Sequence, residues 1–192
     1  FMMPFYLQGI LGYSPSSAGL IMMPMAGCFA LSGPISGWLS DHYGWRKIEI
    51  TGLFCVSISL FLLSFVSTQS KLEVLLPLLG FVGLGMGLFY SPNSASILSV
   101  VEKERYSLAT SFINVTRNYA SIVGISLTTA VITTVMGSLG YEATLDAVRE
   151  VGASHGVKDA FVEGLNSAFR VQVVLTALAV ILTALKGKVA AD

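Results

Sequence analysis

The sequence predicts an all-α integral membrane protein, and three observations lead to that fold class. Of the 192 residues, 54% are hydrophobic and only 11% are charged, and the mean hydropathy is +0.75. Soluble domains carry about 25% charged residues, so this chain has too few charges to cover a water-exposed surface. The charges are also clustered, leaving long stretches without any. Because backbone groups in lipid must pair internally and the alternation typical of a transmembrane β-barrel is absent, we expect these stretches to be helices.

The charge-free stretches are long enough to cross a bilayer. A spanning helix needs about 20 predominantly apolar residues. One partial and five full spans are therefore expected, at about residues 1–8 (partial), 17–38, 48–68, 74–101, 108–136 and 168–186. The partial span is ended by Gly9, Gly12 and Pro15. Since the chain starts inside this helix without a methionine, we expect it to be part of a longer protein.

The lysines and arginines predict the orientation. One set of connections holds six of them and the other holds three: Arg46, Lys47, Lys103, Arg105, Lys186 and Lys188, against Lys71, Arg149 and Lys158. Basic residues concentrate on the cytoplasmic side. We therefore expect a multi-pass protein of the cytoplasmic membrane with its C-terminus inside. Residues 137–167 then form an acidic extracytoplasmic loop. The alternative is that residues 141–151 and 157–166 of this segment form short surface helices.

Several function classes are disfavoured. The formal net charge is zero, which gives no basis for nucleic-acid binding. Cys28 and Cys55 lie in separate spans, and the two histidines fall on opposite sides of the membrane, so no metal or other cofactor is expected. The sequence contains no nucleotide-binding loop or catalytic motif. We therefore do not expect an enzyme.

Arg117 is a charge deep inside an apolar span. It lies about ten residues into the 108–136 span, or roughly 15 Å, near the midplane of the bilayer. An arginine there is costly unless it faces a cavity or a partner. Asn114, Asn118 and Ser121 lie at helical spacing from it and make that side polar. We expect Arg117, Asn114 and Asn118 to line a cavity; the alternative is a structural arginine bonded to the carbonyls of a broken helix.

The 74–101 span combines small residues with a proline. Its glycines permit close helix approach, and Pro92 lacks the N–H that would bond residue 88, which predicts a kink. Kinked helices with freed carbonyls line the central path of transporters. Asn93, beside the kink, is therefore a candidate cavity-lining residue. Close helix packing is an equal explanation for the glycines.

The connection between the 17–38 and 48–68 spans carries the most specific motif. Gly37, Asp41, Gly44, Arg46 and Lys47 have the order and spacing of the cytoplasmic signature loop of the major facilitator superfamily, which this segment resembles. His42 and Trp45 depart from the pattern at two basic positions. The resemblance implies that this loop gates the conformational change.

Further stretches resemble the fourteen-span drug:proton antiporters of that superfamily. They are Pro4-Phe5-Tyr6-Leu7-Gln8, Leu11-Gly12-Tyr13-Ser14-Pro15, Phe89-Tyr90-Ser91-Pro92-Asn93 and Arg117-Asn118. The superfamily fold has two six-helix halves, each an internal inverted repeat. The resemblance therefore implies that this chain is the C-terminal six-helix half of such a bundle, which agrees with the count from charges.

The function implied by the resemblance is secondary active transport, namely proton-coupled efflux of hydrophobic drugs or toxic compounds by alternating access. The partners implied are a hydrophobic small molecule, protons, the lipid bilayer and the missing N-terminal half. In this picture Asp41 contacts a helix N-terminus in one state. Arg46 and Lys47 pair with Glu102, Glu104 or Glu49, and the titrating carboxylates lie in the other half.

Other functions stay open from the sequence. A superfamily importer of a nutrient or organic anion would use Arg117 as an anion ligand. A non-transporting membrane scaffold would use the acidic outer segment to hold a partner. An intramembrane enzyme is the weakest alternative, because no catalytic pair is present.

Overall fold

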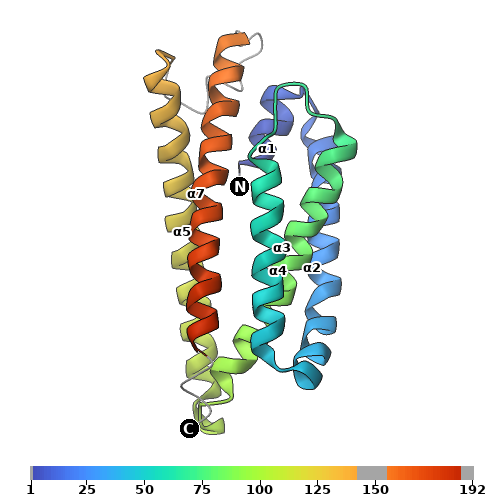
Figure 1. Cartoon of the computed structure of the whole chain (residues 1–192), viewed down its shortest axis with the longest axis vertical. Coiled ribbons are helices and arrows are strands. Elements are labelled where there is room, and N and C mark those ends of the chain that lie inside the picture. The colour runs from blue at the N-terminus through green and yellow to red at the C-terminus, as the bar shows by residue number, and fades with distance from the viewer. Residues whose placement is uncertain (1, 142–154, 187–192) are drawn as a thin grey trace.

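The structure is a computed structural model that describes residues 2–141 and 155–186. The described residues form helices throughout: α1 (Met3–Phe5), a π-helical turn η1 (Tyr6–Ile10), α2 (Pro15–Tyr43), α3 (Trp45–Leu63), α4 (Leu72–Leu98), a 3-10 turn η2 (Lys103–Arg105), α5 (Tyr106–Ser138) and α7 (His155–Lys186). In Figure 1, α2, α3 and α4 stand together, with α5 and α7 beside them. The expected all-α fold is confirmed.

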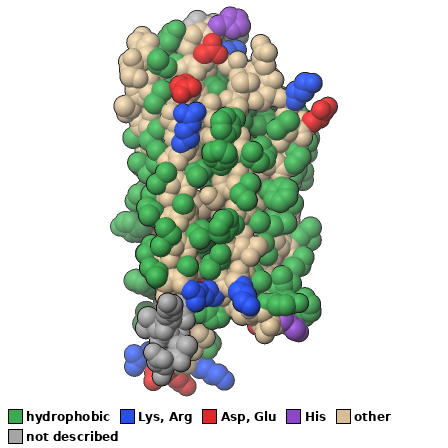
Figure 2. Space-filling model, in the orientation of Figure 1, with side chains coloured by type: hydrophobic (Ala, Val, Ile, Leu, Met, Phe, Trp, Pro, Cys, Tyr) green, Lys and Arg blue, Asp and Glu red, His purple; other side chains and the backbone are tan. Residues whose placement is uncertain are grey.

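An apolar belt surrounds the bundle. Figure 2 shows hydrophobic side chains along the middle of the molecule and charged side chains at its two ends. Among the described residues, four helices are long and apolar enough to cross a membrane: α2, α4, α5 with the turn before it, and α7. The protein is therefore a multi-pass membrane protein.

Local signals explain where α2 begins and ends. Ser14 is the N-cap, its hydroxyl accepting a hydrogen bond from the backbone N–H of Ser17 at 3.2 Å, and Pro15 occupies the first helical position. Both are favoured at a helix start. The helix ends at Tyr43 because Gly44 has a φ of +85°, a conformation that glycine adopts without a steric penalty.

α3 is shorter than the expected 48–68 span. It begins at Trp45 and ends at Leu63, where the Ser64 hydroxyl donates to the carbonyl of Phe61. The prediction ran to residue 68 because the segment after Leu63 lacks charges, but serine and threonine hydroxyls compete for backbone groups and favour turns. With Arg46, Lys47 and Glu49 in its first two turns, α3 is not among the four helices above, so its spanning remains a prediction.

The glycines of α4 are packing sites. A Cβ added to Gly85 would lie 2.6 Å from the Gly52 carbonyl oxygen, and one added to Gly87 would lie 2.8 Å from the Phe29 carbonyl oxygen. Gly83 meets the backbone of Met25 in the same way. α4 is therefore held between α2 and α3 with backbones in contact, as small residues permit.

α7 begins earlier than the expected 168–186 span, so the predicted 137–167 loop is wrong for residues 155–167, which are helical. The alternative helix at 157–166 is confirmed as helical, although it continues into the span and is not a separate short helix. The span was predicted to start at residue 168 because few charges follow that position. Lys158, Asp159 and Glu163 lie before it, so residues 155–167 were not assigned to the span. Asp159 and Glu163 lie on one side of an amphipathic helix whose opposite side is buried, including Phe161 and Leu165, each 0% exposed. Residues 142–154, with most of the alternative 141–151 helix, lie outside the described residues.

The core is concentrated at one end of the bundle. It joins η1, the end of α3, the start of α4 and the first half of α7, with Tyr6, Leu7, Leu63, Leu75 and Phe161 fully buried or nearly so. At this end lie the α3–α4 link and the start of α7, while the α2–α3 and α4–α5 links lie at the opposite end (Figure 1). We call these the outer and inner ends, following the orientation that the lysines and arginines predict.

Candidate functional site

The predicted gating loop is a tight helix junction at the inner end. Gly37 and Asp41 lie in α2, Gly44 is the one residue between α2 and α3, and Arg46 and Lys47 lie in the first turn of α3. Asp41 is exposed and has no ion-pair partner among the residues that the structure describes. Because Asp41 sits in the last turn of α2, the helix dipole disfavours its charge. Within residues 2–141 and 155–186 the Asp41 side chain makes no hydrogen bond, and its contact with a helix N-terminus, expected in one state only, stays a prediction.

Arg46 ties α3 to α7. Its guanidinium donates to the backbone carbonyl of Ala184, in the last turn of α7, where a cation complements the negative end of the helix dipole. Glu102, which was expected to pair with Arg46 or Lys47, instead lies 3.3 Å from Arg105. This pairing is local, between residues three apart, and both side chains are exposed.

Glu49 is the buried acid of the described chain. Its side chain is 1% exposed, whereas the remaining described aspartates and glutamates are exposed. It lies one turn before Gly52, which packs against α4. The sequence placed Glu49 near a cytoplasmic surface and therefore missed this burial, which results from the close packing of α3 on α4.

Arg117 connects α5 to α4. Its Nη2 donates to Ser94 Oγ at 2.6 Å and to the Tyr90 carbonyl at 3.4 Å. Its guanidinium carbon lies 4.6 Å from the centroid of the Tyr90 ring, a cation–π distance. Tyr90 is in turn fixed by edge contacts with Phe29 and Phe89. These partners show how the charge is accommodated within α5, and they agree with the structural alternative for Arg117.

The same side of α5 is polar along half of its length. At 100° per residue, seven positions fall within about a third of the helix circumference. We call them the polar stripe: Ser107, Thr110, Ser111, Asn114, Arg117, Asn118 and Ser121. All except the half-buried Arg117 are exposed. Asn114 and Asn118 thus lie beside Arg117 as expected, although they line neither of the two cavities described below.

Asn93 and Arg117 share a cavity. It has a volume of about 590 Å³ and lies between the second half of α4 and the first half of α5. Its walls are mainly apolar and include Ile97, Leu108 and Phe112, with Arg105 at one end. Pro92 lies next to Asn93 within α4, which continues as one helix through the proline. The structure therefore brings together Asn93 and Arg117, two of the four predicted cavity residues.

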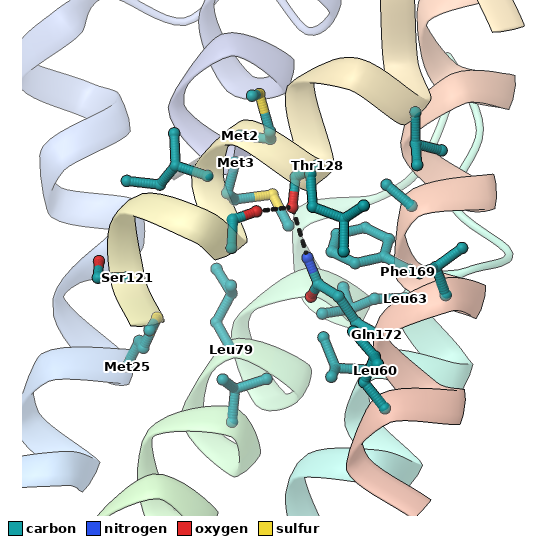
Figure 3. Close-up of a pocket in the computed structure, with 18 of the residues that line it drawn as sticks. Met2, Met3, Met25, Leu60, Leu63, Leu79, Ser121, Thr128, Phe169 and Gln172 are labelled. Atoms are coloured by element: carbon teal, nitrogen blue, oxygen red, sulfur yellow. Dashed lines mark hydrogen bonds between the residues drawn. The ribbon is translucent and has the colours of Figure 1, made fainter. Parts of the chain in front are cut away.

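A second cavity, of about 370 Å³, lies deeper in the bundle beneath Met2 and Met3 (Figure 3). Gln172 projects into it from α7 and donates to Thr128 Oγ1 at 3.0 Å, and Thr128 donates to the Gly124 carbonyl at 2.7 Å. Sequence reasoning missed both residues. The signal was available, because Gln172 is a polar side chain within a nearly continuous apolar stretch.

The described residues contain no group of histidine, cysteine, aspartate and glutamate side chains that could hold a metal ion. The polar groups that do converge are guanidinium, amide and hydroxyl groups, which bind by hydrogen bonding and charge. This arrangement can position a small molecule in a mainly apolar site.

The comparison with family models decides the assignment. Residues 1–189 match the model described as Major Facilitator Superfamily. The chain belongs to this superfamily. Its members are transporters and generally not enzymes, and they bind small-molecule substrates within the membrane.

Curated relatives are named as transporters or resistance proteins. The chain is 35% identical over 124 residues to the riboflavin transporter RibZ of Clostridioides difficile, covering 65% of this chain and 27% of the relative. It is 28% identical over 174 residues to the lincomycin resistance protein LmrB of Listeria innocua, covering 87% and 36%. It is 30% identical over 122 residues to the multidrug resistance protein Stp of Mycobacterium tuberculosis, covering 64% and 22%. The matched part thus spans between about a fifth and just over a third of these relatives.

Proposed function

We propose that this chain is the C-terminal six-helix half of a proton-coupled efflux transporter for hydrophobic compounds, of the fourteen-span type, in the cytoplasmic membrane with its C-terminus inside. The observation that carries the proposal is the polar stripe of α5. Within the predicted 108–136 span, Arg117 is costly to place against lipid, and Asn114 and Asn118 add amide groups to the same side, so this side is expected to face water or other protein. A water-accessible polar face beside a mainly apolar cavity is suited to a translocation path.

The remainder of the protein completes this path. α5 is separated from α4 and α2 along most of its length, and the two cavities occupy the intervening space. The relatives are roughly three to five times longer than the matched segment. We propose that further helices of the same polypeptide cover the polar stripe and narrow both cavities, leaving Asn93, Asn114, Arg117 and Asn118 on the central path.

Proton coupling requires a carboxylate that changes its protonation state. Glu49 is the described carboxylate that is withdrawn from water, and we propose it as a proton carrier, in addition to any in the rest of the protein. In Glu49→Gln, substrate exchange at equal pH is expected to continue, whereas accumulation driven by a pH gradient is lost. Gradient-driven accumulation at the parent rate would contradict this role.

The transport proposal is tested with the full-length protein in proteoliposomes. Ethidium, a hydrophobic cation, and riboflavin are used as fluorescent probes, with an imposed pH gradient of either sign. Ethidium movement against its gradient, abolished by a protonophore, is expected. Identical fluxes in protein-free liposomes would contradict transport of this probe class.

A second candidate function is import of an organic anion. It is favoured by the cavity between α4 and α5, in which Arg105 and Arg117 are the charged lining residues. It predicts that an aromatic carboxylate such as benzoate moves inward while ethidium does not. The same vesicles therefore separate the two candidates.

A further inference from the structure

Three elements meet at one turn at the outer end. The hydroxyl of Tyr6, on η1, donates to the carbonyl of Ser67 at 2.6 Å. Asn166 Nδ2, on α7, donates to the neighbouring carbonyl of Val66 at 2.9 Å. Tyr6 is 0% exposed and Asn166 is 8% exposed. Two consecutive carbonyls of the α3–α4 link are thus held by buried side chains that come from opposite ends of the sequence.

The segment that carries Tyr6 has an unusual backbone. Residues Tyr6–Ile10 form a π-helical turn, with the Leu11 N–H bonded to the Tyr6 carbonyl. Two residues later Gly12 has a φ of +73° and turns the chain toward α2. π-Turns within α-helices are rare and are frequent at functional sites. Because this turn is followed directly by a glycine bend, it is a place where the first helix can change direction.

One buried polar atom beside the α3–α4 link is energetically unfavourable. Asn166 Oδ1 is buried and has no hydrogen-bond partner within residues 2–141 and 155–186. A buried acceptor without a donor loses its hydration without compensation. If the outer end opens, water reaches this oxygen and removes the penalty. The bond from Asn166 to Val66 therefore forms together with an unfavourable buried oxygen on the same side chain.

We propose that the Tyr6–Ile10 turn is a hinge at the outer end and that the Tyr6–Ser67 hydrogen bond is the latch that keeps it closed. Asn166 is a positioning residue, because it fixes the peptide adjacent to the one that accepts the bond from Tyr6. Leu7 and Ile10 are buried in the structure, and opening the latch would expose them to water. This inference goes beyond the proposed function and does not depend on which compound is carried.

The latch is tested by thiol labelling of the full-length protein in lipid nanodiscs, which expose both membrane faces. Cys28 and Cys55 are replaced by serine, and Ile10→Cys provides a buried reporter for a charged methanethiosulfonate reagent. Tyr6→Phe keeps the ring and removes the donor. In the Tyr6→Phe variant, the cysteine at position 10 is expected to be labelled about five times faster. This is the shift that one typical hydrogen bond contributes to an equilibrium between open and closed forms.

Two controls make the result specific. Tyr13→Phe removes a hydroxyl that has no hydrogen-bond partner among the described residues, and it should leave the rate unchanged. A second reporter, Leu53→Cys, lies in α3 away from the turn and should label equally slowly with and without the Tyr6→Phe substitution. Unchanged labelling at position 10, or parallel acceleration at positions 10 and 53, would overturn the latch.

A measurement without reporter cysteines covers the case in which Ile10→Cys does not fold. Amide hydrogen exchange of residues 6–13 is compared between the parent protein and Tyr6→Phe. Faster exchange confined to these residues and to the α3–α4 link is expected. Equal exchange in the two proteins contradicts the latch, whether or not the protein transports any probe.

Discussion

Single residues show both what sequence patterns capture and what they miss. Helix geometry predicted the polar neighbours of Arg117, which lie on the same side of α5 in the structure, whereas its depth in the membrane stays a prediction. Its partners were not predicted, because Tyr90 and Ser94 belong to another span, and a single sequence does not indicate which helices are neighbours. For the same reason the burial of Glu49 and the Gln172–Thr128 bond were missed.

The pairing of Arg117 with Tyr90 predicts a measurable coupling. Tyr90→Leu removes the ring beneath the guanidinium and should lower stability by about 1–2 kcal/mol, whereas Tyr90→Phe should be nearly neutral because the ring remains. In an Arg117→Met background, Tyr90→Leu should cost about 1 kcal/mol less. Denaturation in detergent measures all four variants of this cycle. Additive costs would show that the ring and the guanidinium do not interact.

Asp41 is expected to act on the conformational equilibrium more than on folding. The resemblance to the superfamily implies that Asp41 contacts a helix N-terminus in one state only, a contact that contributes about 0.3–1 kcal/mol. Asp41→Asn removes this contact, shifts the equilibrium between the states and should lower the transport rate by about two- to fivefold at unchanged expression. The efflux rate of the probe, normalised to protein amount, is the readout. An unaltered rate at equal expression would count against a gating role.

At the scale of elements, hydrophobic spans were predictable and boundaries set by packing were not. The 17–38 and 108–136 spans lie within α2 and α5, and the 74–101 span lies near the bounds of α4. Apolar length indicates where these helices are, whereas local signals such as Ser14 and Gly44 determine where α2 begins and ends. α7 begins well before residue 168 because an amphipathic face, with Phe161 buried and Glu163 exposed, extends the helix beyond the charge-free stretch. The sequence indicated this helix only as the alternative at 157–166, because its charges separated it from the charge-free stretch.

The contact of α4 with α3 gives a test at this scale. Gly85→Ala places a Cβ 2.6 Å from the Gly52 carbonyl oxygen, which the backbone cannot easily avoid, so stability should fall by about 1–3 kcal/mol. Gly33→Ala in α2 is the matched control, because no atom lies within 4 Å of the added Cβ. It should be neutral or slightly stabilising, since alanine favours helix. Equal melting temperatures for the two variants would contradict the close packing of these helices.

The whole molecule has a tightly packed outer end and a more open inner end. The buried core lies near the π-helical turn and the start of α7, whereas the cavity that contains Asn93 and Arg117 lies between the second half of α4 and the first half of α5. Sequence reasoning predicted six helical segments and placed the charged connections in two sets. It did not predict this asymmetry, because the asymmetry depends on how separate helices pack against one another.

The central claim is that the face bearing Asn93 and Arg117 belongs to a path that opens alternately to each side of the membrane. The most direct measurement is labelling of Asn93→Cys in the full-length protein, on a background with Cys28→Ser and Cys55→Ser. A charged thiol reagent is applied from one side at a time, under pH gradients of opposite sign. The account predicts that the cysteine reacts from each side under opposite gradients and that a transported probe slows both reactions. Protection from both sides under every condition would contradict it.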